Sequence, residues 1–327
     1  MTQKQQLPHT LIGGLVADAA SLGLHWLYDV NRLAEVTKQH NNDPVFIPID
    51  VKHYSGEVGY FAHGQKHNGM LTQYGESLRL MIDSMNACDG EFNIESVQQH
   101  FKDTFGPGGS YQGYIDKPTA GTLDNLIKGQ TEPSGIDDDQ LPALARLAPV
   151  ILAYHTHDDF KTVLNQAITI TNTHPDALQY GQVYADLLRL ILSGTELKTA
   201  LQQTAEQAPD SIRKPLIDAL NTDEKDPVKY GETTGRACPL SQAMPLCFHI
   251  LNNSDSYQNA IETNIRAGGD NAGRSIVIGT LLGAYYGLDQ DNGIPIEWLL
   301  RLEDGLTLWQ ACDKFAKHIL KSLYNAS

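Results

Sequence analysis

Apolar residues recur at three- and four-residue steps along much of this chain. This spacing marks one apolar face of a helix in residues 10–27, at Leu11, Leu15, Ala19 and Leu22. It returns at Leu78, Met81, Ile82 and Met85, and again at Val183, Leu187, Leu188 and Ile191. Strict alternation of apolar and polar residues, which is typical of a half-buried strand, is almost absent. The pattern therefore predicts an all-α protein whose helices pack on one another.

Glycine spacing singles out two of these helices. Gly279, Gly283 and Gly287 lie four residues apart, so they share one helix face and allow a neighbouring backbone to come close. Gly287 can also end that helix in a left-handed conformation. Gly13 and Gly14 in the first helical segment indicate a partner of the same kind. We expect these two helices at the centre of the molecule.

The chain length and the loop composition suggest one domain with functional loops. The chain has 327 residues, 41% of them hydrophobic, which is enough for a substantial core. No repeat or linker is visible, so residues 1–327 are interpreted as a single domain. Long segments rich in Gly, His, Asn and Tyr cover residues 40–75 and 104–121. Loops of that length are usually functional or disordered, and their aromatic residues favour packed loops that face a ligand.

The charge balance bears on partners and on location. Asp and Glu number 39 against 24 Lys and Arg, and the net charge of -15 repels phosphate backbones and anionic membrane surfaces. We expect no nucleic-acid partner and no membrane association. Asp18 interrupts the apolar N-terminal stretch, which argues against an export signal, and we expect residues 275–287 to be the nearest approach to a membrane helix. Four cysteines without CxxC spacing fit reduced thiols in a cytoplasmic protein.

The segment AGGDNAGRSIVIGTLLGAYYG, residues 267–287, combines a glycine turn, an acid and a strongly apolar helix. Gly268 and Gly269 can free backbone N–H groups just before the helix, whose N-terminus favours anions. Asp270 can cap this helix, ligate a metal or orient a ligand hydroxyl. A simple N-cap, with Arg274 one turn further on, is the structural alternative.

This segment resembles the C-terminal signature of the ADP-ribosylglycohydrolase family. Three other segments resemble that family in the same order: GGLVADAASLGLHW (13–26), TNTHPDALQYGQVYADLL (171–188) and IPIEWLLRLE (294–303). The resemblance implies an all-α fold with two magnesium ions bound between helices. It also implies an enzyme that releases ADP-ribose from modified side chains or small molecules.

The metal motifs depart from the family pattern. The stretch that matches the family's Thr-Asp-Asp-Thr motif lacks both carboxylates and reads Thr72, Gln73, Tyr74 and Gly75. In the second motif Asp270 is kept, whereas the second acid and the final threonine fall at Ala272 and Gly273. Magnesium requires oxygen ligands in near-octahedral geometry. The sequence therefore predicts a degenerate metal site that does not bind a pair of magnesium ions. It predicts no cofactor with certainty. If any metal binds, Thr72 and Asp270 would hold it.

Two further departures concern the ligand. The glutamate that follows the opening helix in the family falls at His25, and the loop that cradles a diphosphate falls at QLPALAR (140–146), without its glycines. Pro142 removes an N–H group there, and Arg146 is what remains of the loop.

Three short segments carry a more specific resemblance within this family. They are LHWLYD (24–29), GYIDKPTAGTL (113–123) and GGDNAGR (268–274). They are similar to the branch that contains the jellyfish J-type crystallins and selenoprotein J. That resemblance implies a retained fold with altered metal motifs.

Glycoside cleavage without a metal requires two carboxyl groups about 5 to 10 Å apart, one protonated and one ionised. Asp18, Glu76 and Asp270 are the candidate catalytic residues, although a structural network explains a buried Asp18 equally well. The cleft is expected to form from residues 13–29, 53–76, 108–122 and 268–274. The expected ligand-binding residues are His25, Thr72, Gln73, Tyr74, Tyr111, Tyr114, Arg146, His174, Gly268, Gly269, Asn271 and Arg274.

The residue types alone also allow two other kinds of site. His53, His63 and His67 could join the acids of the cleft to hold one transition-metal ion or to act as an acid/base pair. Cys238 precedes a helix and follows Arg236, a setting that can stabilise a reactive thiolate. Exposed loop histidines and a buried cysteine are the structural alternatives.

The leading functional hypothesis is a hydrolase that cleaves an ADP-ribosyl or related N- or O-glycosidic bond of a small-molecule ADP-ribose-like ligand. The competing hypothesis is a binding or structural protein that is similar to the crystallins and has lost hydrolysis. Loss of the magnesium-site side chains at positions 73, 74, 75, 272 and 273 favours the second hypothesis. Retention of Asp18 and Asp270 favours a bound ligand, because unpaired buried carboxylates are destabilising.

Overall fold

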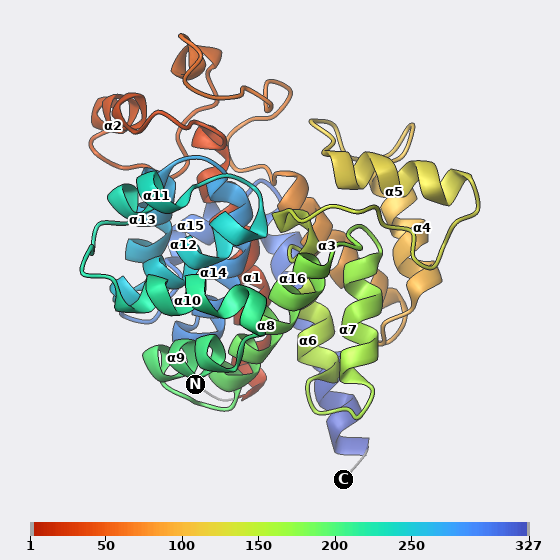
Figure 1. Ribbon diagram of the computed structural model, residues 1–327. Coiled ribbons are helices and arrows are strands. Elements are labelled where there is room, and N and C mark those ends of the chain that lie inside the picture. The colour runs from red at the N-terminus through yellow and green to blue at the C-terminus, as the bar shows by residue number, and fades with distance from the viewer. Residues whose placement is uncertain (1–2, 326–327) are drawn as a thin grey trace.

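The computed structural model describes residues 3–325, with the side chains of residues 6–322 (Figure 1). The described part contains helices and no strands, so the prediction of an all-α fold is confirmed. The α-helices are α1 (Gln3–Ser21), α2 (Val30–Gln39), α3 (Gln73–Ala87), α4 (Ile94–Phe105), α5 (Lys117–Ile127), α6 (Leu147–Tyr154), α7 (Phe160–Thr169), α8 (Pro175–Leu192), α9 (Leu197–Gln207), α10 (Asp210–Asn221), α11 (Pro227–Thr234), α12 (Leu240–Asn253), α13 (Tyr257–Ala267), α14 (Asn271–Tyr286), α15 (Ile296–Leu300) and α16 (Gly305–Asn325). Three short 3₁₀ helices are η1 (Leu22–Leu24), η2 (Val51–Tyr54) and η3 (Leu141–Ala143).

The two glycine-bearing helices, α1 and α14, form the most extensive helix pair in the described chain and lie at its centre (Figure 1). A β-carbon added to Gly13 would overlap the carbonyl oxygen of Gly279, and one added to Gly279 would overlap that of Gly13. A β-carbon on Gly283 would likewise overlap the carbonyl oxygen of His9. The prediction of a central glycine-mediated pair is therefore confirmed.

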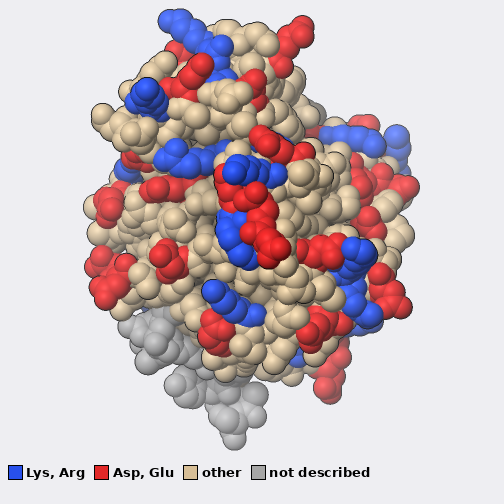
Figure 2. Space-filling view, turned by 60° about the vertical axis from the view of Figure 1, so that its left-hand side comes forward, with Lys and Arg blue, Asp and Glu red and all other residues tan. Residues whose placement is uncertain are grey.

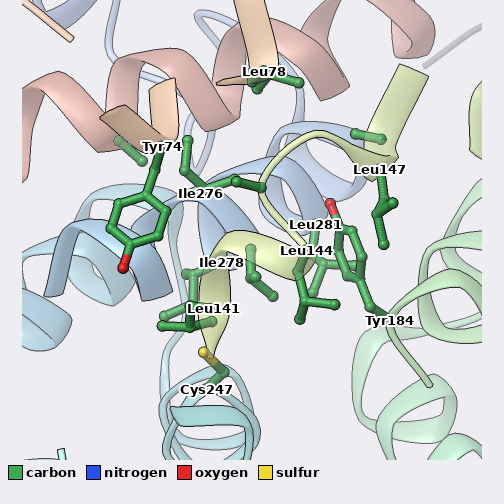
Figure 3. Packing of buried hydrophobic residues seen from close by; sticks show 14 of the residues in the cluster. Tyr74, Leu78, Leu141, Leu144, Leu147, Tyr184, Cys247, Ile276, Ile278 and Leu281 are labelled. Carbon is green, nitrogen blue, oxygen red and sulfur yellow. The ribbon is translucent and has the colours of Figure 1, made fainter. Parts of the chain in front are cut away.

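Several other helices pack around α14, and α3 and α6 among them also contact α1. Figure 3 shows Ile276, Ile278 and Leu281 of α14 among apolar side chains of α3, α6, α8, α12 and η3. The helix ends as the sequence predicts, because Gly287 follows it with φ +85°. Its start is fixed by Asp270, whose side chain accepts a hydrogen bond from the N–H of Gly273.

One expectation about membrane segments is wrong. Residues Gln6–Leu24 are long and apolar enough to cross a membrane by length and composition, so residues 275–287 are not the nearest approach. In the fold 94% of that stretch is buried. A core helix satisfies the same criterion, because both settings select continuous apolar sequence.

Two loop regions extend beyond the helical core. Residues 40–71 contain only the short η2, and residues 106–116 connect α4 to α5. Figure 1 shows the first region beside α2, above the core, and the second region beside α5. Acidic and basic side chains are interspersed on the face shown in Figure 2.

Gly279→Ala is expected to lower the free energy of unfolding by about 1 to 3 kcal/mol, because the new methyl group must separate α1 from α14. Urea denaturation measures this change. The matched control is Gly231→Ala in α11, where the nearest atom to the added β-carbon is Leu246 Cδ2 at 3.4 Å. That variant should be stabilised by roughly 0.5 to 1 kcal/mol through helix propensity. Equal effects at both positions would contradict the close-contact interpretation.

Candidate functional site

The glycine pair before α14 allows the chain there to cross the segment after α1 in close backbone contact. Gly268 and Gly269 have φ +73° and +68°, values that other residues rarely adopt. The N–H of Trp26 donates to Gly269 O at 2.9 Å, and the N–H of Gly269 donates to Leu27 O at 2.8 Å. The N–H of Gly268 is also paired, with Ile265 O. The expectation that these glycines offer free N–H groups to an anion is therefore wrong, because all of these donors are used within the fold.

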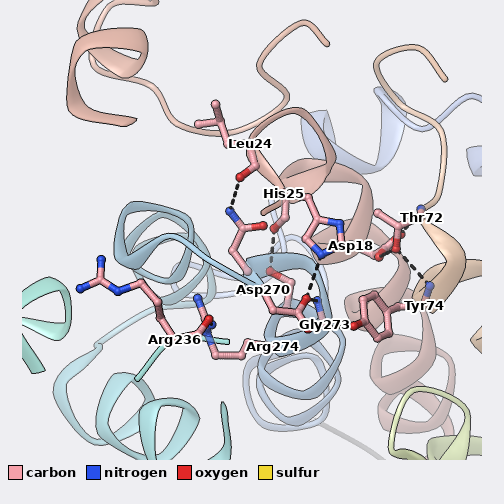
Figure 4. Close-up of polar contacts among 12 residues, drawn as sticks. Asp18, Leu24, His25, Thr72, Tyr74, Arg236, Asp270, Gly273 and Arg274 are labelled. Carbon is pink, nitrogen blue, oxygen red and sulfur yellow. Dashed lines mark hydrogen bonds and ion pairs between the residues drawn. The ribbon is translucent and has the colours of Figure 1, made fainter. Parts of the chain in front are cut away.

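This crossing brings the end of α1 against the start of α14 and places His25 beside Asp270 (Figure 4). Asp270 is fully buried. Its Oδ1 lies 2.8 Å from His25 Nε2 and accepts from the Gly273 N–H at 3.1 Å. Its Oδ2 accepts from the Tyr74 hydroxyl at 2.8 Å. Burial acts to raise the pKa of Asp270, but His25, Cys238 and Tyr74 together bring this pKa below its ordinary value.

A second imidazole continues this network. His25 Nδ1 lies 2.7 Å from His63 Nε2, and both rings are buried. If an ionised Asp270 accepts the Nε2 proton of His25, a neutral His25 accepts the Nε2 proton of His63. His63 Nδ1 is then a basic nitrogen, and it is buried without a hydrogen-bond partner. Burial, followed by the charges of His25 and Lys66, holds the pKa of His63 well below its usual range.

The three histidines of the 53–67 segment are not brought together. His53 lies against His40, and His67 forms an exposed ion pair with Glu303 at 3.2 Å. Over residues 6–322, no group of three or more His, Cys, Asp or Glu side chains could hold a metal ion. The transition-metal alternative is therefore wrong, because its ligands belong to separate parts of the loop.

Asp18 forms a second buried carboxyl site on α1. Its two oxygens accept from the Thr72 N–H at 2.7 Å and from the Thr72 hydroxyl at 2.5 Å. Gly75 leaves room for this approach, since a β-carbon there would overlap the carboxylate. Burial raises the pKa of Asp18 to about 7, although the Thr72 hydrogen bonds and Lys66 oppose the change.

Gln73 links α3 to the start of α5. Its amide donates to the Thr119 hydroxyl at 2.6 Å, and its carbonyl accepts from the N–H of Asp116 at 2.8 Å. Asp116 caps α5 and is buried, and burial raises its pKa. Sequence reasoning missed Asp116, although an acid directly before Lys-Pro-Thr is a helix-start signal.

These contacts decide whether a magnesium pair fits. Both oxygens of Asp270 and the hydroxyl of Thr72 are already engaged by protein groups. Position 73 supplies an amide that is held by α5, and position 74 supplies a phenol that donates to Asp270. The donor set does not fit two hard divalent cations, which need several free oxygen ligands. Whether this chain binds any metal stays a prediction for experiment.

An aromatic cluster covers the histidine pair. Trp26 stacks on His25 with ring centroids 4.1 Å apart, and it meets Tyr114 and Tyr60 edge-on or tilted, at 5.0 and 5.8 Å. Tyr60 is exposed, whereas Trp26 is buried and has φ +63°. Such a backbone angle is uncommon outside glycine and is often found at functional sites. The sequence indicated Tyr60 and Tyr114 as aromatic residues of ligand-facing loops, but it gave no signal for Trp26, whose loop shows no periodicity.

Several expected ligand residues are held by the protein itself. Arg274 donates to Asn264 Oδ1 at 2.7 Å and to backbone carbonyls of Arg236 and Gly268. Arg146 is buried and donates to Thr171 Oγ1 at 2.7 Å and to backbone carbonyls. The side chain of Asn271 donates to Leu24 O, and His174 caps α8. These contacts give the four residues structural roles, and ligand contacts by them stay predictions.

Glu76 and Tyr111 line a cavity of about 210 Å³ between α3 and α4. Glu76 is largely buried, and burial raises its pKa although Arg79, 4.0 Å away, opposes the change. A larger cavity of about 920 Å³ lies elsewhere, beside the C-terminal parts of α6 and α16. Neither cavity is lined by Asp270 or His25.

The surroundings of Cys238 disfavour a reactive thiolate. Burial, reinforced by the charge of Asp270, raises the pKa of the Cys238 thiol well above its ordinary value. A thiolate is therefore disfavoured at neutral pH. The Arg236 guanidinium instead donates to Val228 O in α11, and the Arg236 carbonyl accepts from the Arg274 guanidinium.

Comparison with known proteins adds independent information. The family model described as ADP-ribosylglycohydrolase matches residues 2–324. Crystallin J1A of Tripedalia cystophora is 25% identical over 97% of this chain and 98% of its own length. Crystallin J1B of the same animal is 23% identical over 91% of this chain and 92% of its own. Among solved structures, an ADP-ribosylglycohydrolase-related protein complex has a similar fold, with a TM-score of 0.69 and 16% identity over 97% of this chain and 99% of that one.

Asp18→Asn is expected to gain stability relative to the wild type as pH rises from about 4 to 7. The folded-state pKa of Asp18, about 7, exceeds the ordinary value of 3.8, so its contribution is fully present below pH 3.8 and is lost as pH rises toward 7. Asparagine keeps the Thr72 contacts without this titration. Urea denaturation from pH 4 to 8 should show a difference that grows by at most about 1.4 kcal/mol per pH unit. A difference that does not change with pH would contradict the raised pKa.

Tyr74→Phe is expected to lower the free energy of unfolding by about 1 to 3 kcal/mol, because Asp270 Oδ2 loses its donor inside the protein. Urea denaturation is the measurement. Tyr286→Phe is the matched control, because the Tyr286 hydroxyl donates to Asp255 O at an exposed site. That control should change stability by less than about 0.5 kcal/mol. If Tyr74→Phe leaves the free energy of unfolding unchanged, water or another donor replaces the hydroxyl.

Proposed function

Because the chain belongs to the ADP-ribosylglycohydrolase family, we propose that it hydrolyses an ADP-ribosyl or related N- or O-glycosidic bond without a magnesium pair. The observation that carries this proposal is the unpartnered Nδ1 of His63, at the end of the Asp270–His25–His63 network. Other buried polar atoms of the described chain also lack a partner, but this one ends a chain of coupled groups that leads to a buried carboxylate. One nitrogen lone pair is left for a proton, and the carboxylate at the other end of the chain can stabilise the charge that results.

The proposed chemistry uses this nitrogen as a general base. His63 Nδ1 takes a proton from water while the water oxygen bonds to the anomeric carbon and the glycosidic bond breaks. Asp270 orients His25, which in turn orients His63; Asp270 is a positioning residue because both of its oxygens are already engaged by protein groups. Glu76 is the proposed acid that protonates the leaving group, since its raised pKa favours the protonated form. Asp18, with its pKa of about 7, is a second carboxyl group that can hold a proton.

The ligand and the setting follow from the same proposal. The aromatic side chains of Trp26, Tyr60 and Tyr114 offer flat apolar surfaces next to the histidine pair, as a nucleoside-like ligand requires. We propose a small ADP-ribose-like molecule as the ligand. All four cysteines are free thiols, which supports the proposal of a cytoplasmic location.

A second candidate function is a binding or structural role without turnover. Both curated relatives are named crystallins, and the carboxylates of Asp18 and Asp270 have hydrogen-bond partners inside the protein. In that case the network would stabilise the contact between α1, α3 and α14. This alternative predicts no release of ADP-ribose under any condition.

Release of ADP-ribose from ADP-ribosylated side chains and small molecules is the test of the proposal, measured with magnesium and with EDTA. We expect equal rates in both, and a loss of about 100-fold or more in kcat for Asp270→Asn and His63→Gln, the usual range for removed acid–base catalysis. Asp89→Asn, at an exposed position, is the control and should keep full activity.

Three results would contradict this proposal in different ways. A rate that requires magnesium would show that a metal site forms despite the occupied donors. No release, together with stabilisation by ADP-ribose in a thermal-shift titration, would favour a binding protein. No release and no stabilisation would favour a structural, crystallin-like role.

A further inference from the structure

Lys66 is a buried lysine without an acidic partner. Its side chain is 7% exposed. Among the described residues, no ion pair within 4.0 Å includes it. Lysine is almost never buried unless it is paired, because its ammonium group carries three donors and a full charge. Nζ itself is not among the buried polar atoms without a partner, so the lysine stem is covered by protein while the ammonium group stays accessible to a ligand.

The surroundings of Lys66 hold its ammonium group in place. Its Nζ lies 4.4 Å from the ring centroid of Tyr111, in a cation–π contact. Gly113 leaves room for the lysine stem, since a β-carbon there would lie 3.2 Å from Lys66 Cε. The Lys66 N–H donates to His63 O at 2.9 Å, which fixes the loop one turn after the histidine pair. The lysine thus belongs to the same loop as the proposed base.

Carboxyl groups on three elements face this ammonium group from beyond ion-pair distance. Asp18 on α1, Glu76 on α3 and Glu303 before α16 all favour its charged form, against the effect of burial, which lowers the pKa of Lys66. Glu76 has Arg79 as a closer partner and Glu303 has His67. For Asp18, Lys66 is the basic group that favours the ionised form. Lys66 thus lies among carboxyl groups without bonding to any one of them.

We propose that Lys66 supplies the positive charge of the site and that its ammonium group donates hydrogen bonds to sugar hydroxyl groups of the ligand. A hydroxyl both accepts and donates, so it can bridge the Lys66 ammonium group and a nearby carboxylate across a gap that neither side chain closes alone. An oxyanion could also accept from Lys66, but any of these three carboxyl groups that is ionised would repel it, whereas a neutral hydroxyl is compatible with either protonation state. The chemical class that matches this mixture of charges is therefore a neutral polyol, such as the ribose of a nucleotide sugar.

This inference deepens the proposed function and rests on it for the location of the ligand. Lys66 is a positive charge that the chain itself places near these carboxyl groups. The inference concerns binding, however, so a measurement of binding can test it whether or not the bond is cleaved.

Titration calorimetry of the full-length protein with ADP-ribose, D-ribose and inorganic pyrophosphate is the experiment. Lys66→Met keeps the apolar stem on Tyr111 and removes the charge, whereas Lys66→Arg keeps the charge. We expect Lys66→Met to weaken ADP-ribose binding by about 10- to 100-fold, the usual loss for a hydrogen bond to a charged group. Lys66→Arg should restore part of this loss. Lys52→Met, at an exposed position, is the control and should bind as the wild type does.

The outcomes separate this inference from the proposed hydrolysis. Unchanged ADP-ribose affinity in a folded Lys66→Met variant overturns the role of Lys66, even if the wild type hydrolyses its substrate. Pyrophosphate binding that is lost in Lys66→Met, with ribose binding unaffected, overturns the hydroxyl assignment in favour of an oxyanion. Loss of ADP-ribose and ribose affinity in Lys66→Met, in a protein without turnover, supports the inference and overturns only the hydrolysis. A wild type that binds neither ADP-ribose nor D-ribose overturns both.

Discussion

The close backbone contact between α1 and α14 is the constraint on which the other features depend. Gly13 and Gly279 allow the two helices to touch through their main chains, and no larger residue could occupy either position without separating them. Because the helices are this close, the chain after α1 can cross the turn before α14 through hydrogen bonds between Trp26, Gly269 and Leu27. His25 and Asp270, which are 245 residues apart in sequence, consequently lie within hydrogen-bonding distance.

Buried charge in this protein is compensated mainly by hydrogen bonds. Asp270 keeps a low pKa in the core because His25, Tyr74 and Cys238 outweigh its burial, whereas Asp18 has only Thr72 as a hydrogen-bonding neighbour and its pKa is raised to about 7. Two carboxyl groups on neighbouring helices thus differ in pKa because their partners differ.

The site that results combines features of a structural core with features of a ligand site. Arg274 and Asp270, whose side chains have hydrogen-bond partners inside the protein, stabilise the contact between the end of α1 and the start of α14, as expected of a core network. In contrast, His63 Nδ1 has no partner and Lys66 has no ion pair, although both side chains are buried. Both belong to the loop between η2 and α3, which is also covered by the aromatic side chains of Trp26 and Tyr60. A loop that carries such polar groups over a rigid helical base is typical of a binding region.

The sequence by itself determined the helical class, the central pair of glycine-bearing helices and the place of Asp270 at the start of a helix. Helical periodicity, glycine spacing and helix capping are local properties. It also indicated that the magnesium ligands are missing, since that depends only on residue types. The tertiary structure alone decided that His25 joins His63, that Gly268 and Gly269 serve a crossing, and that Lys66 is buried on Tyr111. These contacts arise where irregular loops meet helix ends. Loops carry no periodic signal, and side chains far apart in sequence become neighbours only when the helices have packed.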